Sequence, residues 1–424
     1  MGIKNLLKDH LSPQQMTMIK KPVMYARYCK SILKHTYGTR KENENLVDSV
    51  KTYSMPGKHV FFGYYDLQQF DKKQKRLLVH VLDAKKCTPA KDSVDLMYID
   101  CATGKFMPIT STRAWSWQQG SRLRWHPTKE NCVLFNAVED DHYSTAVWNI
   151  ESGKKEAVYP MAFYDITPDM KYGLNVNYDR LQRLRPGYGY SCFKDNTSGM
   201  NVPENEGIVR YNIETGESKL LISLKELAGR VTTSNDVEHY INHISVSPSG
   251  EKFLFFHLWS STHTAKWDMR LYVANIETGE LTCVEDDYVI SHYCWRDDNE
   301  LVTTTGPKNG ETPKYIKYDL SDKLFKIQRG EWLNRDGHPS YIYGTGNYIS
   351  DTYPISCMQY VFKEEGTEGT EILRVYSDPR LFEEKRCDLH PRLTPDNKFI
   401  TVDSTYKNRL RHVVLMKMKQ GWTE

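Results

Sequence analysis

The sequence predicts an all-β protein, a seven-bladed β-propeller that follows a basic, helical N-terminal extension. Three observations predict this fold. Beyond residue 50, short β-rich runs are separated by turn signals, and helical periodicity is nearly absent. These runs recur in one order, a turn followed by a strand and then a hairpin. The order repeats at about 45 to 50 residues, which is the period of four-stranded propeller blades.

The N-terminal extension is predicted over residues 1–45. Residues 1–41 contain nine Lys or Arg and a single acid, Asp9, with apolar residues between them. This pattern favours a helix that packs on the main domain, and the alternative interpretation is a segment that contacts an anionic membrane surface. The segment has no apolar core with a cleavage site, and no run of about eighteen apolar residues occurs. Neither secretion nor a membrane span is therefore expected.

The propeller itself is predicted over residues 46–424. Hairpin turns such as "ESGK" at 151–154 and "ETGE" at 277–280 each follow an aliphatic strand. A pair of β-sandwiches is the alternative fold, but it would require no fixed period. The sequence leaves open whether a strand near residues 46 to 62 closes the seventh blade. The seven repeated units begin near residues 64, 120, 161, 241, 290, 336 and 388.

Composition and charge exclude several classes of function. The net charge of +3 and the lack of a basic, aromatic-interleaved stripe argue against a nucleic-acid partner. The nine cysteines are scattered and form no CxxC pair, which favours reduced thiols in a cytosol. The sequence contains no motif of serine hydrolases, P-loop NTPases or dinucleotide-binding domains. We therefore expect a cytoplasmic protein, held at the inner face of the membrane if the N-terminal segment binds lipid.

Histidines recur just ahead of the predicted first strand in several units. Because the first strand of each blade lines the central channel, equivalent residues of the repeats converge on its axis. Imidazole is the usual nitrogen ligand of Zn, Mn, Fe and Ni, so histidines from four consecutive blades predict a divalent metal site at the channel mouth. The alternative interpretation is that each histidine caps its blade through the neighbouring backbone. The predicted metal ligands are His243, His292, His338 and His390, and the equivalent positions in the other blades are Asp66, Arg122 and Phe163.

Two further stretches carry candidate substrate-binding residues. In "AWSWQQGSRLRW" at 114–125, Trp117, Gln118 and Gln119 suit a cleft that stacks on a sugar ring and bonds its hydroxyls, although tryptophans here are also typical of a core. The longest interval between units contains "RLQRLRPGYGY" at 180–190, whose arginines, Arg183 among them, either hold an acidic substrate or are solvated. His257 either faces the pocket or lies in the core.

Two consecutive segments, "NHISVSPSGEKFLFFHLWS" at 242–260 and "SHYCWRDDNELV" at 291–302, resemble the corresponding blades of oligogalacturonate lyases. The resemblance implies a seven-bladed propeller that cleaves short uronic-acid oligomers with a manganese-type ion held by channel histidines. His243 and His292 match the pocket and metal histidines of that family, whereas His338 and His390 fit by their place in the blades. The stretches "AWSWQQG", "RLRPGYGY" and "CDLHPR" are not motifs of that family.

The resemblance also implies a mechanism, the β-elimination of a uronate. A metal ion and an arginine would bind the C6 carboxylate while a base takes the C5 proton and the 4-O-glycosidic bond breaks. Arg122 is the first candidate for the carboxylate clamp or the base, with Arg185, Tyr188 and His257 as competitors. The expected enzyme is a carbon–oxygen lyase that uses a divalent metal, expected to be Mn, and acts on an acidic oligosaccharide or polysaccharide.

Two other classes of function remain as alternatives. A non-enzymatic propeller would bind a glycan or serve as an assembly platform in polysaccharide biosynthesis. A glycosyl hydrolase or transferase would need two channel carboxylates, and no spacing favours Asp66, Asp165 or Asp336 for that role.

Overall fold

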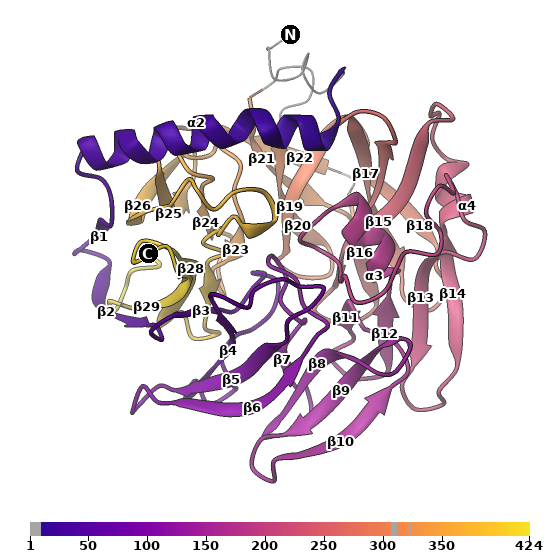
Figure 1. Cartoon of the computed structure of the whole chain (residues 1–424), viewed down its shortest axis with the longest axis horizontal. Coiled ribbons are helices and arrows are strands. Elements are labelled where there is room, and N and C mark those ends of the chain that lie inside the picture. Colours follow the sequence, from indigo (N-terminus) through magenta and orange to yellow (C-terminus); the bar gives the residue numbers. More distant parts are fainter. Residues whose placement is uncertain (1–9, 307–311, 323) are drawn as a thin grey trace.

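The computed structural model describes residues 10–306, 312–322 and 324–424. Its strands form seven antiparallel sheets arranged around a central axis (Figure 1). Within the described residues, six sheets contain four strands and one contains five. The seven-bladed β-propeller predicted from the sequence repeat is therefore confirmed.

The first four blades are simple meanders, because each β-rich run pairs with the next. Among the connections within these blades, the longest is the insertion between β12 and β13. Blade 4 has the longest strands, and its first strand is almost entirely buried. The strands of blades 1 to 4 are, in order, β3 (Lys58–Phe61), β4 (Arg76–Asp83), β5 (Val94–Asp100), β6 (Phe106–Thr112), β7 (Arg124–Trp125), β8 (Cys132–Val138), β9 (Tyr143–Asn149), β10 (Lys154–Tyr159), β11 (Asp165–Ile166), β12 (Tyr172–Asn175), β13 (Gly207–Asn212), β14 (Ser218–Ser223), β15 (Val237–Val246), β16 (Lys252–Ser261), β17 (Trp267–Asn275) and β18 (Leu281–Glu285).

Blades 5 to 7 continue the meander, and the last two each take one strand from the N-terminal part of the chain. A one-turn 3₁₀ helix, Glu383–Lys385, lies in the connection between blades 6 and 7. The strands of these blades are β19 (Val289–Trp295), β20 (Glu300–Gly306), β21 (Tyr315–Asp319), β22 (Leu324–Gln328), β23 (Ser340–Tyr341), β24 (Tyr348–Asp351), β25 (Met358–Glu365), β26 (Glu368–Tyr376), β27 (Arg392–Leu393), β28 (Phe399–Ser404) and β29 (His412–Met418), joined by β1 (Arg40–Glu42) and β2 (Val47–Tyr53).

The ring is closed by strand β2, which is the outermost strand of blade 7. It pairs antiparallel with β29, from Val47 opposite Met418 to Tyr53 opposite Val413. Because β29 would otherwise present an open edge, β2 covers that edge, and the pairing ties the N-terminal part of the chain to the last strand. Strand β1 pairs in the same way with β26 of blade 6. The question that the sequence leaves open at residues 46 to 62 is thus answered.

The N-terminal segment contains helix α2 (Pro13–Leu33), which crosses one face of the propeller (Figure 1). The helix begins at a capping box, in which the Ser12 side chain accepts from the Gln15 backbone and the Gln15 side chain accepts from Ser12. Its two ends rest on different blades, because the Leu11 carbonyl accepts from Ala265 and Ser31 bonds the Tyr376 hydroxyl. No helix among the described residues is long and apolar enough to cross a membrane. Residues 1–9 lie outside the described residues.

Two short helices complete the fold. Helix α3 (Tyr178–Leu184) opens the long insertion between β12 and β13, and α4 (Leu224–Ala228) follows β14. The insertion is pinned to blade 4, since Arg183 pairs with both Asp195 and Glu238. These ion pairs with buried carboxylates therefore fix the position of the insertion on the propeller.

A buried histidine in blade 1 makes the stability of the fold depend on pH. His80 on β4 is completely buried, and burial lowers its pKa to about 4. Since an unfolded histidine has a pKa of about 6.5, the unfolded state binds a proton between these values that the folded state does not. The free energy of unfolding should therefore fall as the pH falls, by about 2 kcal/mol at about pH 5 from His80 alone. Urea unfolding at neutral and acidic pH measures this loss.

A matched pair of variants isolates the contribution of His80. His80→Gln should reduce the difference in unfolding free energy between the two pH values, whereas His142→Gln, which changes an exposed histidine, should leave it as in the wild type. An unchanged pH dependence in His80→Gln would contradict the assignment.

Candidate metal centre

The mouth of the channel is formed where the innermost strands begin. Arg122 and His390 lie just before β7 and β27, and His243 lies at a β-bulge of β15. These three residues share a left-handed backbone, with φ of 55°, 56° and 49°, which is strained in residues other than glycine. The shared conformation agrees with their alignment as equivalent positions of the repeat. Phe163, the aligned residue of blade 3, instead packs 5.7 Å from the Tyr211 ring between blades.

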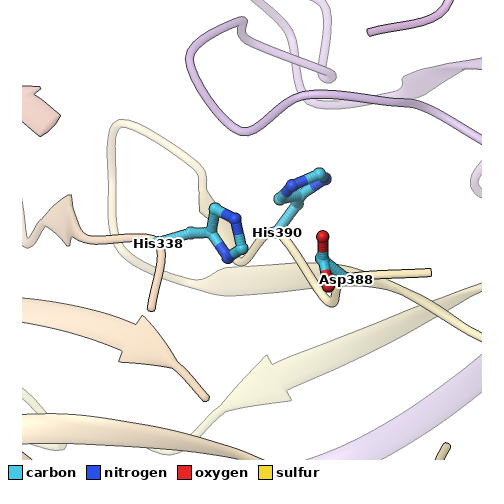
Figure 2. Close-up of side chains that lie close together, drawn as sticks. All are labelled: His338, Asp388 and His390. Atoms are coloured by element: carbon cyan, nitrogen blue, oxygen red, sulfur yellow. The ribbon is translucent and has the colours of Figure 1, made fainter. Parts of the chain in front are cut away.

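Three side chains able to bind a metal meet at this mouth. His338 precedes β23, whereas Asp388 and His390 precede β27, so two adjacent blades supply them (Figure 2). Their ligand atoms all lie within 4.8 Å of one another, and all three residues are buried. Two imidazoles and one carboxylate are a donor set suited to Mn, Fe or Zn. We refer to these three residues as the His-Asp-His group.

Hydrogen bonds fix the orientation of both imidazoles. His338 Nδ1 donates to Asp351 Oδ1 and His390 Nδ1 donates to the Gly63 carbonyl, each at 2.7 Å. Because Nδ1 holds the proton, Nε2 carries the lone pair in both rings. His390 Nε2 is buried and has no hydrogen-bond partner among the described residues. An unsatisfied buried acceptor is costly, and a cation at this place would satisfy it, so the group fits a divalent ion.

The charge state of the His-Asp-His group also suits a cation. Burial lowers the pKa of both His338 and His390 well below the usual range, so the imidazoles are neutral at neutral pH. Burial raises the pKa of Asp388, but the Arg386 guanidinium more than offsets this and holds that pKa well below its usual value. Arg386 Nε and Nη2 each donate to the Asp388 carboxylate at 2.7 Å. The group therefore offers two neutral ligands and one anionic ligand.

Asp388 was not among the ligands predicted from the sequence. It stands two residues before His390 in "CDLHPR", and residues i and i+2 of an extended segment point to the same side. This Asp-x-His spacing is the signal that would have identified it.

The other two histidines predicted as ligands lie at different distances from the group. The His292 ring is 3.9 Å from the His338 ring, and His292 Nδ1 lies 3.1 Å from Asp336 Oδ1. His243 is separated from the group by Tyr64, whose ring is 5.0 Å from the His243 ring and 4.9 Å from the His390 ring. The structure thus brings three of the four predicted histidines together and places the fourth behind a tyrosine.

Arg122 is held in an internal ion pair. Its Nη1 and Nη2 donate to the two Asp66 carboxylate oxygens at 3.0 and 2.9 Å, and its Nε donates to the Tyr164 carbonyl at 2.8 Å. Both charged side chains are almost fully buried. A substrate carboxylate would have to displace Asp66 to reach this guanidinium, so the geometry favours a structural role for Arg122.

The insertion after β12 brings a different arginine to the mouth. Arg185 follows α3 directly, and its guanidinium lies 5.6 Å from the Tyr188 ring and 5.0 Å from the Trp267 ring. Among the described residues it has no carboxylate partner. The Tyr188 ring in turn lies 5.4 Å from the His243 ring. The long loop that the sequence singled out therefore presents an unpaired cation next to the channel histidines.

The remaining predicted site residues lie away from the His-Asp-His group. Trp117 is buried with its ring 5.9 Å from Phe61, and Gln119 donates to the Tyr164 hydroxyl. His257 lies within blade 4, where its Nε2 is 2.9 Å from His239 Nδ1. These three residues are packed within the propeller.

Gln118 supports the site indirectly. Its amide donates to the backbone carbonyls of Glu384 and Arg386 at 3.0 and 2.8 Å, which holds the connection that leads to Asp388. Gln118 thus positions the segment on which Arg386 and Asp388 stand.

A cavity of about 700 Å³ opens at the other end of the channel. It is bounded by the turns that follow the innermost strands, including Pro127, Pro168 and Pro248, and by Asp66, the ion-pair partner of Arg122. None of the channel histidines lines it. Tyr65 lines the cavity and its ring lies 5.3 Å from the His338 ring, so this side chain stands between the cavity and the candidate metal centre.

Comparisons with known proteins show the fold. No family model matches the chain, and no curated protein matches its sequence. Among solved structures, an oligogalacturonate lyase in complex with manganese superposes with a TM-score of 0.64 at 15% identity, covering 92% of this chain and 100% of that one. The oligogalacturonate lyase of Vibrio parahaemolyticus gives a TM-score of 0.62 at 10% identity, covering 91% of this chain and 98% of that one. The chain is structurally similar to these lyases along nearly its whole length.

Proposed function

We propose that the protein is a metal-dependent lyase that cleaves a uronate-containing oligosaccharide by β-elimination. The observation that carries this proposal is the His-Asp-His group at the channel mouth, with Arg185 nearby. Within the described part of the chain, the buried His390 Nε2 has no hydrogen-bond partner and Arg185 has no carboxylate partner. The similarity to oligogalacturonate lyases, one of them bound to manganese, supports the same conclusion at the level of the fold.

The His-Asp-His group would hold the metal ion, with His292 as the adjoining imidazole. When bound, the ion would supply positive charge that stabilises the negative charge developing on a uronate carboxylate. Arg386 keeps Asp388 ionised, and Asp351 keeps the His338 proton on Nδ1, so both contacts prepare the ligands.

Arg185 is the residue assigned to bind the substrate carboxylate. Arg386 is neutralised by Asp388 and Arg122 by Asp66, whereas Arg185 rests on aromatic rings with its donors available. A planar guanidinium binds a carboxylate through two parallel hydrogen bonds, which orients the sugar as well as attracting it.

Tyr188 is assigned to proton transfer, because its side chain lies between Arg185 and His243. In the reaction the base takes the proton from C5 and the C5–H bond breaks. The electron pair forms a C4–C5 double bond, and the bond from C4 to the glycosidic oxygen breaks. That oxygen takes a proton, so the products are an unsaturated uronate and a shortened oligosaccharide. No oxidant or reductant is required.

The test is the ultraviolet absorbance of the unsaturated product when the manganese-loaded protein is mixed with oligogalacturonates or other uronate oligomers. Tyr188→Phe should lower kcat by about 100-fold or more without loss of bound metal. Arg185→Gln should raise KM by about tenfold or more. Tyr98→Phe on β5 serves as the control and should behave as the wild type. If metal-loaded protein binds uronate oligomers and yields no unsaturated product, a glycan-binding propeller replaces the lyase.

A further inference from the structure

Helix α2 turns an apolar face away from the propeller. Its inner side is fixed by Met16 and Ser31, which are buried. Residues spaced three or four apart share one face of a helix, so Met18, Tyr25 and Leu33 lie together on the opposite side, where they are 71%, 62% and 79% exposed. Pro22 and Cys29 fill the positions between them and are also exposed. The outward stripe of α2, defined as Met18, Pro22, Tyr25, Cys29 and Leu33, is thus apolar throughout.

Cations flank this stripe. Residues 10–34 contain no acidic residue. One basic side chain, Lys20, bonds Glu383 on the propeller. The other basic residues are exposed as well. Lys21 and Lys30 lie beside the outward stripe, whereas Arg27 and Lys34 stand four residues before and three residues after the buried Ser31.

Further apolar side chains extend the surface beside the stripe. Ile19, Val23 and Ile32 are 49%, 46% and 45% exposed. An exposed apolar patch of this kind, on a helix with cations and no acids, is the arrangement of helices that lie in the interface of an anionic membrane. A partner protein would require acidic side chains placed to match Lys21 and Lys30, whereas a bilayer with anionic headgroups offers negative charge at every position of its surface.

From this arrangement we infer that the outward face of α2 docks on a membrane surface that carries anionic lipid. The apolar side chains enter the boundary between headgroups and acyl chains, and the cations contact lipid phosphates. The docked helix is anchored firmly to the propeller, because Arg380 stacks 3.5 Å from the Tyr28 ring and Thr17 donates to Glu383. Arg380 and Glu383 belong to the connection that carries Asp388, so docking would set the channel mouth beside the bilayer.

The experiment is sedimentation of the full chain with vesicles. Vesicles of phosphatidylcholine alone are compared with vesicles of equal parts phosphatidylcholine and phosphatidylglycerol. The wild type should sediment with the second kind only, and high salt should weaken this binding because exposed charges are screened. Met18→Glu/Leu33→Glu should lower the partition coefficient at least about tenfold, since both side chains are exposed and the fold does not depend on them. Lys21→Glu/Lys30→Glu should lower it as well.

The control is Met107→Glu, which places the same charge at an exposed methionine of β6, the outermost strand of blade 1, and should bind as the wild type. Equal sedimentation of the wild type and Met18→Glu/Leu33→Glu would overturn the inference. A second result would also overturn it: the wild type sediments with neither kind of vesicle and forms a dimer in analytical ultracentrifugation, whereas Met18→Glu/Leu33→Glu is monomeric. In that case the face would be an interface between two copies. Neither outcome depends on lyase activity.

Discussion

Asp388→Asn is expected to lower the affinity for Mn²⁺ by about 100-fold or more and to abolish the proposed lyase activity with it. The substitution keeps the size of the side chain and removes the only charged ligand of the His-Asp-His group. Isothermal titration of metal-free protein with Mn²⁺ measures the change directly.

The loss must be separated from a loss of folding, because Asp388→Asn also leaves Arg386 without its counter-ion. His390→Gln removes a ligand while the Arg386–Asp388 pair stays intact, so it should lower the affinity while the thermal unfolding of metal-free protein stays near that of the wild type. Asp141→Asn, at a carboxylate that is 91% exposed, is the control and should titrate normally. Wild-type affinity in both Asp388→Asn and His390→Gln would show that the ion, if present, binds elsewhere.

Arg122→Met is expected to lower the free energy of unfolding by about 3 to 5 kcal/mol. It would leave the Asp66 carboxylate buried without its partner, since the two side chains are 1% and 5% exposed. The pair joins the start of blade 2 to the segment that follows β3, so its loss weakens the contact between these two parts of the propeller. Urea unfolding followed by circular dichroism gives the value.

Two further variants define the origin of that effect. Arg122→Met/Asp66→Asn removes the uncompensated charge and should recover a large part of the stability. Lys129→Met breaks a solvent-exposed pair with Glu156 and should lower the free energy of unfolding far less than Arg122→Met does. An Arg122→Met protein within about 1 kcal/mol of the wild type would contradict the structural role of this pair and return Arg122 to the list of substrate-binding candidates.

The fold could be predicted from the sequence because its signals are local and repeated. Each hairpin turn, such as that at 151–154, depends on a few neighbouring residues, and the same turn-and-strand pattern recurs in several units of the repeat. Closure by β2 could not be predicted, since Val47–Tyr53 pairs with a strand more than 350 residues later and carries no signal of its partner.

The candidate site was predicted less completely, because side-chain direction depends on register. The innermost strands β7, β11, β23 and β27 are only two residues long, and a shift of one residue in a strand turns every side chain to the other face. The equivalent positions of the repeat therefore include His390, and His338 by its similar place, but also Phe163, which packs between blades. Asp388 lies outside these equivalent positions, two residues before His390.

Residues from irregular segments were the hardest to place. The length of the insertion after β12 indicated a functional loop, and Arg185 and Tyr188 do reach the mouth from it. Nothing in "RLQRLRPGYGY" distinguishes Arg185 from Arg183, whose partners Asp195 and Glu238 come from elsewhere in the chain. Ion pairs formed in the folded chain engage Arg183 and leave Arg185 to bind a substrate carboxylate, and the local sequence does not show this difference.

The most direct test of the account is anomalous diffraction from crystals of the protein grown with Mn²⁺, with data collected near the manganese absorption edge. The account predicts one strong anomalous peak in each chain, enclosed by His338 Nε2, His390 Nε2 and an Asp388 carboxylate oxygen. A map with no peak at the channel mouth, or with its peak among surface carboxylates such as Glu285, Asp286 and Asp287, would contradict it.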